Sequence, residues 1–343
     1  MSVKGVNMVT IDDVAKRAGV SKGTVSNVFS KKRPISTEVT ERVLNIAKEL
    51  NYVPNHIARS LAIKKTMVIG LKMQTTDFEL SGFDLKVING VVKKCTENGY
   101  RVLLDRVFES EESALYSRDP VDGIILLNPK DDDPRIRQYK NSNLPFVVIG
   151  RPGKNDHDTR FVDNNNIKIA KEVGEYLIDI GHQEILFLNA AKDMTVATDR
   201  REGFKLAYEN YDLPFKEANI VYNNQIKHKS ASDFGFYSLL EVYDKKAHTA
   251  IIADTDRVAL GVLRAARELN LEIPNYLSLI ALSNNETLAM ETTPKFTSVE
   301  LYPEKLGEEA TEVLINVLNG NLAPKKKIIA AKLVIRESCK TLT

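Results

Sequence analysis

The chain has 343 residues, 43% hydrophobic and 27% charged, which is ordinary for a globular protein and long enough for two or three compact units. No run approaches the ~18 consecutive apolar residues of a membrane span, and the N-terminal stretch MSVKGVNMVTIDD lacks the apolar core of an export signal. These features exclude membrane-spanning and exported proteins, so we expect a cytoplasmic protein with no membrane partner.

The cysteines and acidic runs give little support for a metal site. Cys95 and Cys339 lie far apart, so neither a disulfide framework nor a four-ligand zinc site can be drawn, and we expect two reduced, partly buried thiols. The run PKDDDPR could hold an ion. Asp133 followed by Pro134 is more typical of a helix N-cap with proline at the first helical position.

The charge is unevenly distributed along the chain. Residues 1–65 carry twelve Lys and Arg against five Asp and Glu, whereas the remainder carries 36 against 41. A basic segment on a mildly acidic body is expected where one end of a protein meets a polyanion. The alternative is a chance bias on a solvated surface.

Residues 10–50 predict three helices. Thr10 can cap the first helix, Ser21 the second, and Ser36 or Thr37 the third. The third helix has the best apolar stripe, formed by Val39, Val43, Ile46, Ala47 and Leu50. Two short helices joined by the turn AGVS are typical of a helix-turn-helix.

The second of these helices has a polar face opposite its apolar one. The N-terminal residues of a recognition helix meet base edges in the major groove, where Lys22 could donate to guanine and Asn27 could pair with adenine. The polar face consists of Lys22, Gly23, Ser26, Asn27 and Ser30. Helix N-termini favour phosphate groups, so hydroxyls near them are expected to contact the DNA backbone. These hydroxyls belong to Thr10, Ser21, Thr24 and Ser36. The alternative is a small helical domain with a solvated polar face.

The next segment, YVPNHIARSLAIKK, begins with a proline and is basic. Ile57 and Leu61 lie four residues apart, as do Ala58 and Ala62, which predicts a short helix beginning at Asn55. About nine residues are too few for a helix that is stable alone in water.

From residue 67 onward, short β-branched runs alternate with helical stretches. This alternation predicts two successive α/β units, each with a mostly parallel sheet. The expected strands are 67–73, 100–107, 121–127, 145–150, 184–189, 218–223, 249–253 and 277–282. The expected helices are 83–98, 134–142, 164–180, 199–210, 229–244 and 255–269. A last strand, helix and strand, at 295–301, 303–319 and 326–337, complete the two units.

The sequence resembles the LacI/GalR family of bacterial transcription regulators over essentially its whole length. The most specific stretches are TIDDVAKRAGVSKGTVSNVF and VLNIAKELNYVPNHIARSLA, followed by VDGIILL, GRP, FVDNNN, LIDIGHQEILFL, DRREGFKLA and TDRVALGVLRAARELNLEIP. The resemblance implies an all-α helix-turn-helix DNA-binding head plus a hinge helix. These would be joined to a two-lobed α/β core like periplasmic binding proteins, with two mostly parallel sheets.

The resemblance also implies domain boundaries. Residues 1–54 would form the DNA-binding domain, 55–65 the hinge, and 66–343 the effector-binding and dimerisation core. The chain would cross between the lobes near 162, 293 and 324. The first lobe would comprise about 66–162 and 294–323, and the second about 163–293 and 324–343.

For the hinge, the resemblance implies folding on double-stranded operator DNA. In the family two hinges of a homodimer pack in the minor groove, where the residue matching Leu61 wedges between base steps. The small Ala58 and Ala62 would let the paired helices approach, and Arg59 could reach phosphate. Asn55 completes the expected DNA contacts.

For the core, the resemblance implies a small-molecule carbohydrate effector between the lobes. The matching positions are Phe83, Arg200, Thr255, Asp256 and Ser283. Thr255 and Ser283 stand where the family often has Asn and Asp, and Asn27 stands where many members have Arg. The elements IGRP and PKFTSVEL are similar to the maltose-type branch, which favours a glucoside or similar sugar.

We therefore expect a sequence-specific repressor of carbohydrate-utilisation genes whose operator affinity is changed allosterically by a sugar. No phosphate-loop, G-x-S-x-G or H-E-x-x-H pattern occurs, and His182 resembles a structural turn residue, so we expect neither an enzyme nor a cofactor. A sugar-binding transport protein would not carry the basic head. A catabolite-control-type regulator that senses a phosphorylated carrier protein stays open. No leucine heptads follow the last predicted strand, which favours a dimer over a tetramer.

Overall fold

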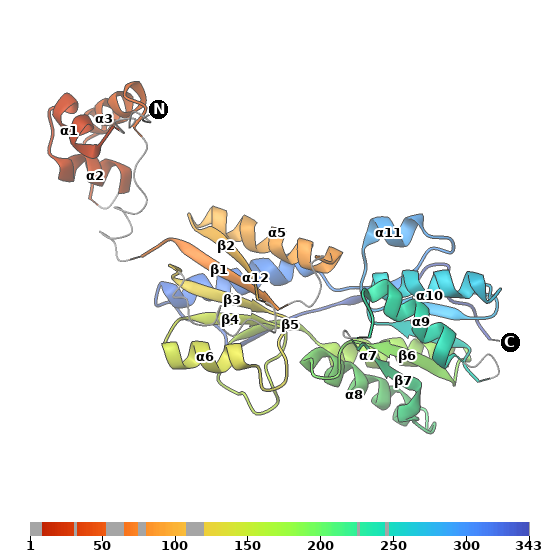
Figure 1. Ribbon diagram of the computed structural model, residues 1–343. Coiled ribbons are helices and arrows are strands. Elements are labelled where there is room, and N and C mark those ends of the chain that lie inside the picture. Colours follow the sequence, from red (N-terminus) through yellow and green to blue (C-terminus); the bar gives the residue numbers. More distant parts are fainter. Residues whose placement is uncertain are drawn as a thin grey trace, which may run out of the picture. The chain divides into compact units, whose positions relative to one another are not determined.

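The structure is a computed structural model that describes residues 9–30, 33–52, 65–74, 80–107, 120–224, 227–243 and 247–342. The chain divides into two compact units, Met1–Thr66 and Met67–Thr343 (Figure 1). The hinge residues of the sequence prediction, namely Asn55, Ala58, Arg59, Leu61 and Ala62, lie outside the described residues.

The described residues of the first unit form three helices, α1 (Ile11–Ala18), α2 (Lys22–Ser30) and α3 (Thr37–Glu49). Their apolar faces meet in one core, which includes Val14, Ala18, Val25, Val28, Val43 and Ala47. Each helix begins at the hydroxyl residue expected from the sequence. The side chains of Thr10 and Ser21 accept backbone N–H bonds, whereas Ser36 stands at the N-cap without a capping bond.

The second unit contains two six-stranded sheets, and each sheet with its helices is one lobe. The first sheet has the order β11-β5-β4-β3-β1-β2, and every neighbouring pair is parallel. Its strands are β1 (Val68–Gln74), β2 (Arg101–Val107), β3 (Gly123–Leu127), β4 (Phe146–Ile149), β5 (Phe161–Asn164) and β11 (Lys326–Ile329). The predicted mostly parallel sheet is confirmed for this lobe.

The second sheet has the order β12-β10-β9-β8-β6-β7 and is parallel except for the pair β10–β12. Its strands are β6 (Ile185–Asn189), β7 (Ile220–Tyr222), β8 (Ala250–Ala253), β9 (Ser278–Ala281), β10 (Thr297–Glu300) and β12 (Lys332–Val334). Strands β6, β8 and β9 are buried at every position, as expected for parallel strands covered on both faces.

Helices cover both faces of each sheet. In the first lobe, α5 (Gly82–Glu97) and α12 (Pro303–Leu318) pack on one face and α6 (Pro134–Ser142) on the other. In the second lobe, α7 (Asn166–Asp179) and α8 (Thr195–Asn210) cover one face, and α9 (Ala231–Val242) and α10 (Asp256–Glu268) the other (Figure 1). As expected from the sequence, Asp133 caps α6 and Pro134 is its first residue.

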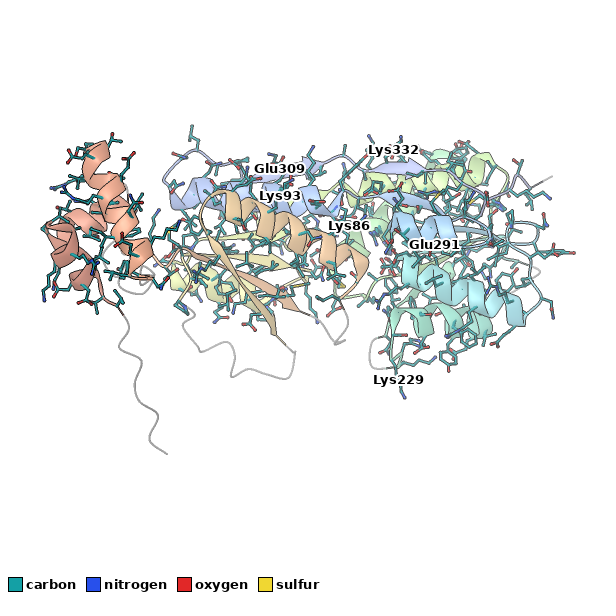
Figure 2. All side chains as sticks on the ribbon, turned by 90° about the horizontal axis from the view of Figure 1, so that it is seen from above. Lys86, Lys93, Lys229, Glu291, Glu309 and Lys332 are labelled. Atoms are coloured by element: carbon teal, nitrogen blue, oxygen red, sulfur yellow. The ribbon has the colours of Figure 1, made fainter. Side chains whose placement is uncertain are left out.

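Glycines allow the helix pairs to approach closely. A Cβ atom on Gly90 of α5 would lie 2.0 Å from the Glu304 carbonyl oxygen of α12, a contact that real Cβ atoms do not make. Figure 2 shows these two helices side by side, with Lys93 and Glu309 labelled on them. The crossing fixes α12, whose N-terminal end follows one of the lobe crossovers.

Two of the three predicted crossover positions are wrong. The chain leaves the first lobe after β5, close to the predicted position near 162. It returns only after β10, because 297–300 pair with β9, so the crossing near 293 is misplaced. It leaves again between β11 and β12, because 326–329 pair with β5, so the crossing near 324 is misplaced too. Apolar runs do not encode which sheet they join, since partner strands lie far away in sequence.

The last predicted strand, 326–337, is therefore two strands in different sheets. Two helices also differ from the prediction. Helix α8 begins at Thr195, one turn before the expected residue 199, and the short helix α11 (Glu286–Glu291) was not expected.

A buried asparagine joins all three crossover segments. Asn164 is the last residue of β5, and its Nδ2 donates to the carbonyl oxygens of Leu301 at 3.1 Å and Ile329 at 3.0 Å. Leu301 follows β10, and Ile329 ends β11. Relative movement of the lobes must therefore bend the chain around Asn164.

Candidate functional site

A cavity of about 220 Å³ lies between the two lobes. It is lined by residues at or just after the carboxyl ends of β3, β4, β5, β6, β8 and β9, the edge where open α/β sheets bind ligands. Its polar lining includes Asn128, Asp163, Asn164, Arg200, Asp254, Thr255 and Ser283, and its apolar lining includes Phe83, Leu127, Ile149, Met194 and Leu301. The cavity thus combines convergent polar groups with an apolar wall.

Arg200 on α8 is the cationic group of this lining and is only 5% exposed. Its Nη1 forms an ion pair with the Asp254 carboxylate and also lies 3.4 Å from the Asp254 carbonyl oxygen. Burial raises the pKa of Asp254, and the guanidinium opposes that rise. The Nε of Arg200 is buried and has no hydrogen-bond partner among the residues that the structure describes. The N–H at Nε is therefore a buried donor that the described residues leave unsatisfied.

Asp163 at the end of β5 is a second buried ionisable group of the cavity. Its carboxylate accepts backbone N–H bonds from Asn164 at 2.7 Å and Arg151 at 2.9 Å, and the side-chain amide of Asn166 at 3.2 Å. Burial raises the pKa of Asp163 to about 7, and the negative charge of Asp199 adds to that rise against the hydrogen bonds.

Four of the five predicted effector residues line the cavity, namely Phe83, Arg200, Thr255 and Ser283. The Phe83 ring packs against the apolar cores of both lobes. The hydroxyl oxygen of Thr255 accepts the N–H of Val258 at 3.2 Å, and that of Ser283 accepts the N–H of Asp256 at 3.0 Å.

The structure does not bring the fifth, Asp256, to this cavity. Its carboxylate accepts the Arg257 N–H at 2.8 Å at the start of α10 and lines a small adjoining hollow. The sequence reasoning missed Asp163, Asn164 and Asp254. Asp254 directly follows the predicted strand 249–253, so its signal was available, whereas the strand β5 that carries Asp163 and Asn164 was not predicted from the sequence.

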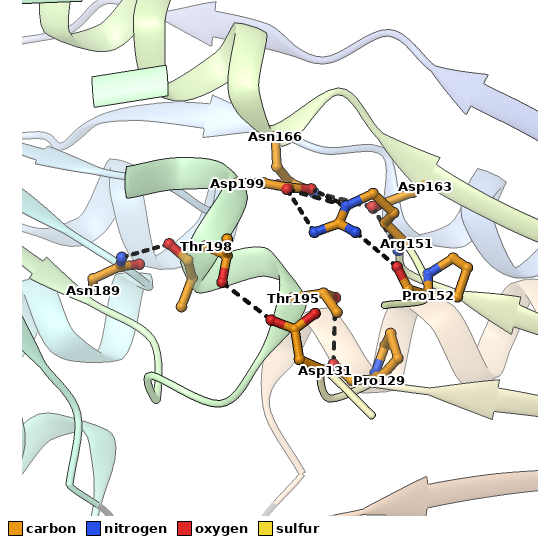
Figure 3. Close-up of polar contacts among 11 residues, drawn as sticks. Pro129, Asp131, Arg151, Pro152, Asp163, Asn166, Asn189, Thr195, Thr198 and Asp199 are labelled. Carbon is orange, nitrogen blue, oxygen red and sulfur yellow. Dashed lines mark hydrogen bonds and ion pairs between the residues drawn. The ribbon is translucent and has the colours of Figure 1, made fainter. Parts of the chain in front are cut away.

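Polar contacts join the lobes beside the cavity (Figure 3). Arg151 follows β4, and its guanidinium binds the Asp199 carboxylate of α8 through three contacts of 2.8, 2.8 and 3.1 Å. The Thr195 N–H and the Thr198 hydroxyl of α8 reach the first lobe at Pro129 O (3.3 Å) and Asp131 (3.5 Å). The helix that carries Arg200 is thus fixed against the opposite lobe.

In the first unit, the predicted recognition face is accessible. Lys22, Gly23 and Ser26 are exposed on α2, and Asn27 is half-buried. The Lys22 Nζ lies 3.2 Å from an Asp12 carboxylate oxygen, an exposed contact of small energetic value.

The predicted phosphate-facing hydroxyls differ in their surroundings. The Thr10 hydroxyl and N–H both donate to Asp13, at 2.7 and 2.9 Å, so a carboxylate already occupies the start of α1. The hydrogen bond from the Thr10 N–H lowers the pKa of Asp13, which keeps this charge in place. Ser21 and Thr24 contact each other at 3.0 Å, and the exposed Ser36 makes no capping bond. Ser36 is thus the most accessible of the four to a phosphate.

His182, which the sequence analysis interpreted as a structural residue, lies in a network of hydrogen bonds. His182 is buried, and its ring nitrogens contact the hydroxyls of Thr249 and Ser278, both at 2.9 Å, and the Lys340 carbonyl oxygen at 3.1 Å. Across the described parts of the chain, no group of three His, Cys, Asp or Glu is arranged to hold a metal ion. None of the helices that the structure describes is long and apolar enough to span a membrane.

Comparison with known proteins places these features in a family. Two family descriptions match: bacterial regulatory proteins of the lacI family over residues 10–55, and a periplasmic binding protein-like domain over 175–339. The HTH-type transcriptional regulator MalR of Staphylococcus xylosus is 34% identical, in a match that covers 98% of this chain and 99% of that protein.

Solved structures agree with this assignment. The transcriptional regulator CelR–cellobiose complex is 26% identical with a TM-score of 0.72, and the match covers 96% of this chain and 99% of that one. The Lac repressor dimer bound to operator and an anti-inducer has the same fold, with a TM-score of 0.84, 22% identity, and coverage of 97% and 100%.

A helix-turn-helix head and a two-lobed core with an interlobe cavity define a DNA-binding transcriptional regulator. The chain belongs to the LacI family of bacterial regulatory proteins. The sequence-based predictions of family, fold class and regulatory function are thereby confirmed.

Proposed function

We propose that the chain is a repressor of carbohydrate-utilisation genes that binds its operator as a homodimer and changes its operator affinity when a small sugar occupies the interlobe cavity. The observation that carries this proposal is the interlobe cavity lined by Asp163, Asp254 and Arg200, whose buried Nε has no partner among the described residues. A buried donor without a partner is unfavourable, so a ligand that supplies an acceptor gains from it.

The cavity lining suits a sugar. A sugar ring has hydroxyls that both donate and accept, and apolar C–H faces. Asp163 and Asn164 offer hydrogen-bonding groups, Arg200 offers a donor, and Phe83 offers an aromatic surface. The volume of about 220 Å³ lies below the roughly 300–1,000 Å³ of drug-sized ligand pockets, which favours a small ligand.

The relatives support the same class of ligand. The regulator MalR and the CelR structure with cellobiose carry sugar-related names or ligands of their own. A maltose-type or other glucoside effector is therefore our proposal for this chain. A regulator that instead senses a phosphorylated carrier protein would respond without a ligand in the cavity.

The proposed DNA contacts lie on α2 and near the helix starts. Lys22, Ser26 and Asn27 would meet base edges, and Ser36 would meet phosphate. The predicted hinge would insert Leu61 into the minor groove at the operator centre.

The first lobe offers a surface for the proposed homodimer. Leu85 and Val92, seven residues apart on one side of α5, are 50% and 43% exposed. The neighbouring β2 is the last strand of its sheet, and its Leu103 and Leu104 are 37% and 42% exposed. Apolar side chains beside a strand that is the outermost of its sheet among the described residues favour pairing with a second copy.

The cavity between the lobes explains how ligand and DNA would be coupled. A sugar that contacts both lobes favours one lobe arrangement, which would change the spacing of the two heads in a dimer. A coupling of ~1–3 kcal/mol would change operator affinity roughly 5–150-fold.

A thermal-shift screen of mono- and disaccharides on the purified full chain tests the ligand class. A ligand at about 100 times its Kd stabilises the folded state by ~2.7 kcal/mol, which raises the melting temperature. A shift with a sugar supports the proposal. No shift with any sugar, together with a shift on adding a phosphorylated carrier protein, would establish the competing function.

A further inference from the structure

The cavity holds more negative than positive charge. Among the described residues that line it, Asp84, Asp163 and Asp254 are acidic and Arg200 is basic. Lysine is absent from that described lining, and so is histidine. A buried site that binds an anion normally supplies a surplus of donors from Arg, Lys or free backbone N–H groups.

The guanidinium groups of Arg200 and Arg151, near the cavity, are both paired with carboxylates of the chain. Arg200 forms an ion pair with Asp254. Arg151 lies beside the cavity, and its Nε and Nη2 each donate to one carboxylate oxygen of Asp199, both at 2.8 Å. The buried Nε–H of Arg200 has no hydrogen-bond partner among the described residues and can donate to one acceptor.

Helix N-termini could also attract an anion; acidic residues of the chain compensate those of α5 and α10, whereas the start of α8, where Thr195 lines the cavity, has no acidic residue in its first turn. Asp84 accepts the Ser81 N–H at 2.9 Å and the Ser81 hydroxyl at 2.7 Å at the start of α5. Asp256 accepts the Arg257 N–H at 2.8 Å at the start of α10. These carboxylates use the positive end of the helix dipole that a phosphate would otherwise use.

The pKa of Asp163 reflects the excess of acidic over basic residues in and near the cavity. Its pKa rises to about 7, mainly through burial, and the neighbouring Asp199 adds to the rise. A further anion placed beside these carboxylates would meet the same repulsion in the same desolvated space.

We infer that the effector is an uncharged or amino sugar, and that phosphorylated sugars and sugar acids are excluded by the carboxylates of the cavity. This inference rests on the proposed function and narrows its ligand class. A phosphate ester adds about −1.5 to −2 charge at neutral pH, whereas a hydroxyl adds none. Hydroxyls can donate to Asp163, and a ring or hydroxyl oxygen can accept from Arg200 Nε.

Matched sugar derivatives test the inference with the full chain. For each of several sugars, glucose and maltose among them, the neutral parent, its 6-phosphate, its uronic acid and its amino derivative are compared by thermal shift and calorimetry. For any parent that binds, we expect both anionic forms to bind weaker by about 10-fold or more and the amino form within about 10-fold. An anionic form that binds within about 10-fold of its parent, or more tightly, overturns the inference while the proposed function stands. If no form of any sugar binds, the proposed function itself fails.

Charge-neutral variants identify the groups responsible. Asp254→Asn releases the Arg200 charge into the cavity, so the discrimination against the anionic form should fall by about 10-fold or more. Asp163→Asn should also lower the discrimination against the anionic form. This variant replaces Asp254→Asn in the test if Asp254→Asn does not fold. Asp158→Asn is the matched control, because it removes the same charge from an exposed loop paired with Lys325 outside the cavity. If all the variants and the wild type discriminate equally against the anionic sugar, Asp254 and Asp163 are not the groups that exclude it.

Discussion

Arg151 and Asp199 connect the two lobes through a two-pronged ion pair, with Nε 2.8 Å from one carboxylate oxygen and Nη2 2.8 Å from the other. Asp199 directly precedes Arg200, so the pair that joins the lobes also positions the helix that presents Arg200 to the cavity. Closure of the lobes and the geometry of the proposed sugar site are therefore physically linked.

Replacing Asp199 should weaken sugar binding. Asp199→Asn removes the charge from the interlobe pair, and a hydrogen bond to a charged group contributes ~1.5–3 kcal/mol. We expect a sugar that binds between closed lobes to lose about 10-fold or more in affinity, measured by calorimetry. The control Asp158→Asn loses the same charge from an exposed pair within the first lobe, with 3.1 Å between Lys325 Nζ and Asp158. Equal losses in the two variants would mean that the Arg151–Asp199 pair has no special part in binding.

Variants of the Arg200–Asp254 pair can distinguish an effect on the stability of the core from an effect on the response of operator binding to sugar. Arg200→Ala leaves the buried Asp254 without its cation, which we expect to destabilise the core by about 3–5 kcal/mol. The double variant Arg200→Met, Asp254→Asn removes both charges at similar volume and should recover most of that loss. Both variants should lose the response of operator binding to sugar.

Thermal melts with and without sugar, and operator titrations by fluorescence anisotropy, check this pair of expectations. Operator binding in the absence of sugar is the internal control and should stay near the wild-type level in the double variant. A double variant that still responds at wild-type sugar concentrations would remove Arg200 from the proposed site.

Asp163 should give the core a characteristic dependence of stability on pH. Its pKa is about 7 in the folded chain and 3.8 as a model value for the unfolded one, so the folded state binds more protons between these values. Stability therefore falls as pH rises from about 4 to about 7, by up to a few kcal/mol. Asp163→Asn should abolish this part of the fall, so its melting temperature should exceed the wild-type value more at pH 8 than at pH 5. Parallel curves for the two proteins would show that Asp163 ionises normally.

Asn27 is the sharpest test of the recognition face. Asn27→Ala should lower specific operator affinity by ~1–3 kcal/mol, because one side chain that reads a base is lost. Binding to unrelated DNA and its salt dependence should stay unchanged, since no phosphate-facing cation is removed. Competition between operator and unrelated DNA at several salt concentrations measures both. A uniform loss on both DNAs would instead indicate that Asn27 only supports the helix.

The sequence predicted the local parts of this molecule better than their connections. Residue patterns located the three described helices of the head, and the resemblance to the family identified Phe83, Arg200, Thr255 and Ser283, which line one cavity. The patterns could not assign 297–300 and 326–329 to their sheets, because strand partnership depends on residues more than a hundred positions away for β11 and β5.

The missed site residues have a similar explanation. In the sequence Asp254 looks like an ordinary polar residue after a strand, and Asp163 lies in a stretch for which no strand was predicted. Their importance arises from burial and from charged neighbours, Asp199 and Arg200, that the fold brings next to them. Asp256 shows the opposite error, since its place in the motif suggested the cavity, whereas its carboxylate binds the start of its own helix.

The most direct test of the central claim is the operator affinity of the full chain with and without a sugar that stabilises it. An operator is first selected from random DNA with the purified protein, and its Kd is then measured by fluorescence anisotropy at fixed salt. We expect the neutral sugar that raises the melting temperature to change this Kd by roughly 5–150-fold, and its phosphorylated counterpart to have no effect at the same concentration. An operator Kd that is identical with and without the stabilising sugar would contradict the account.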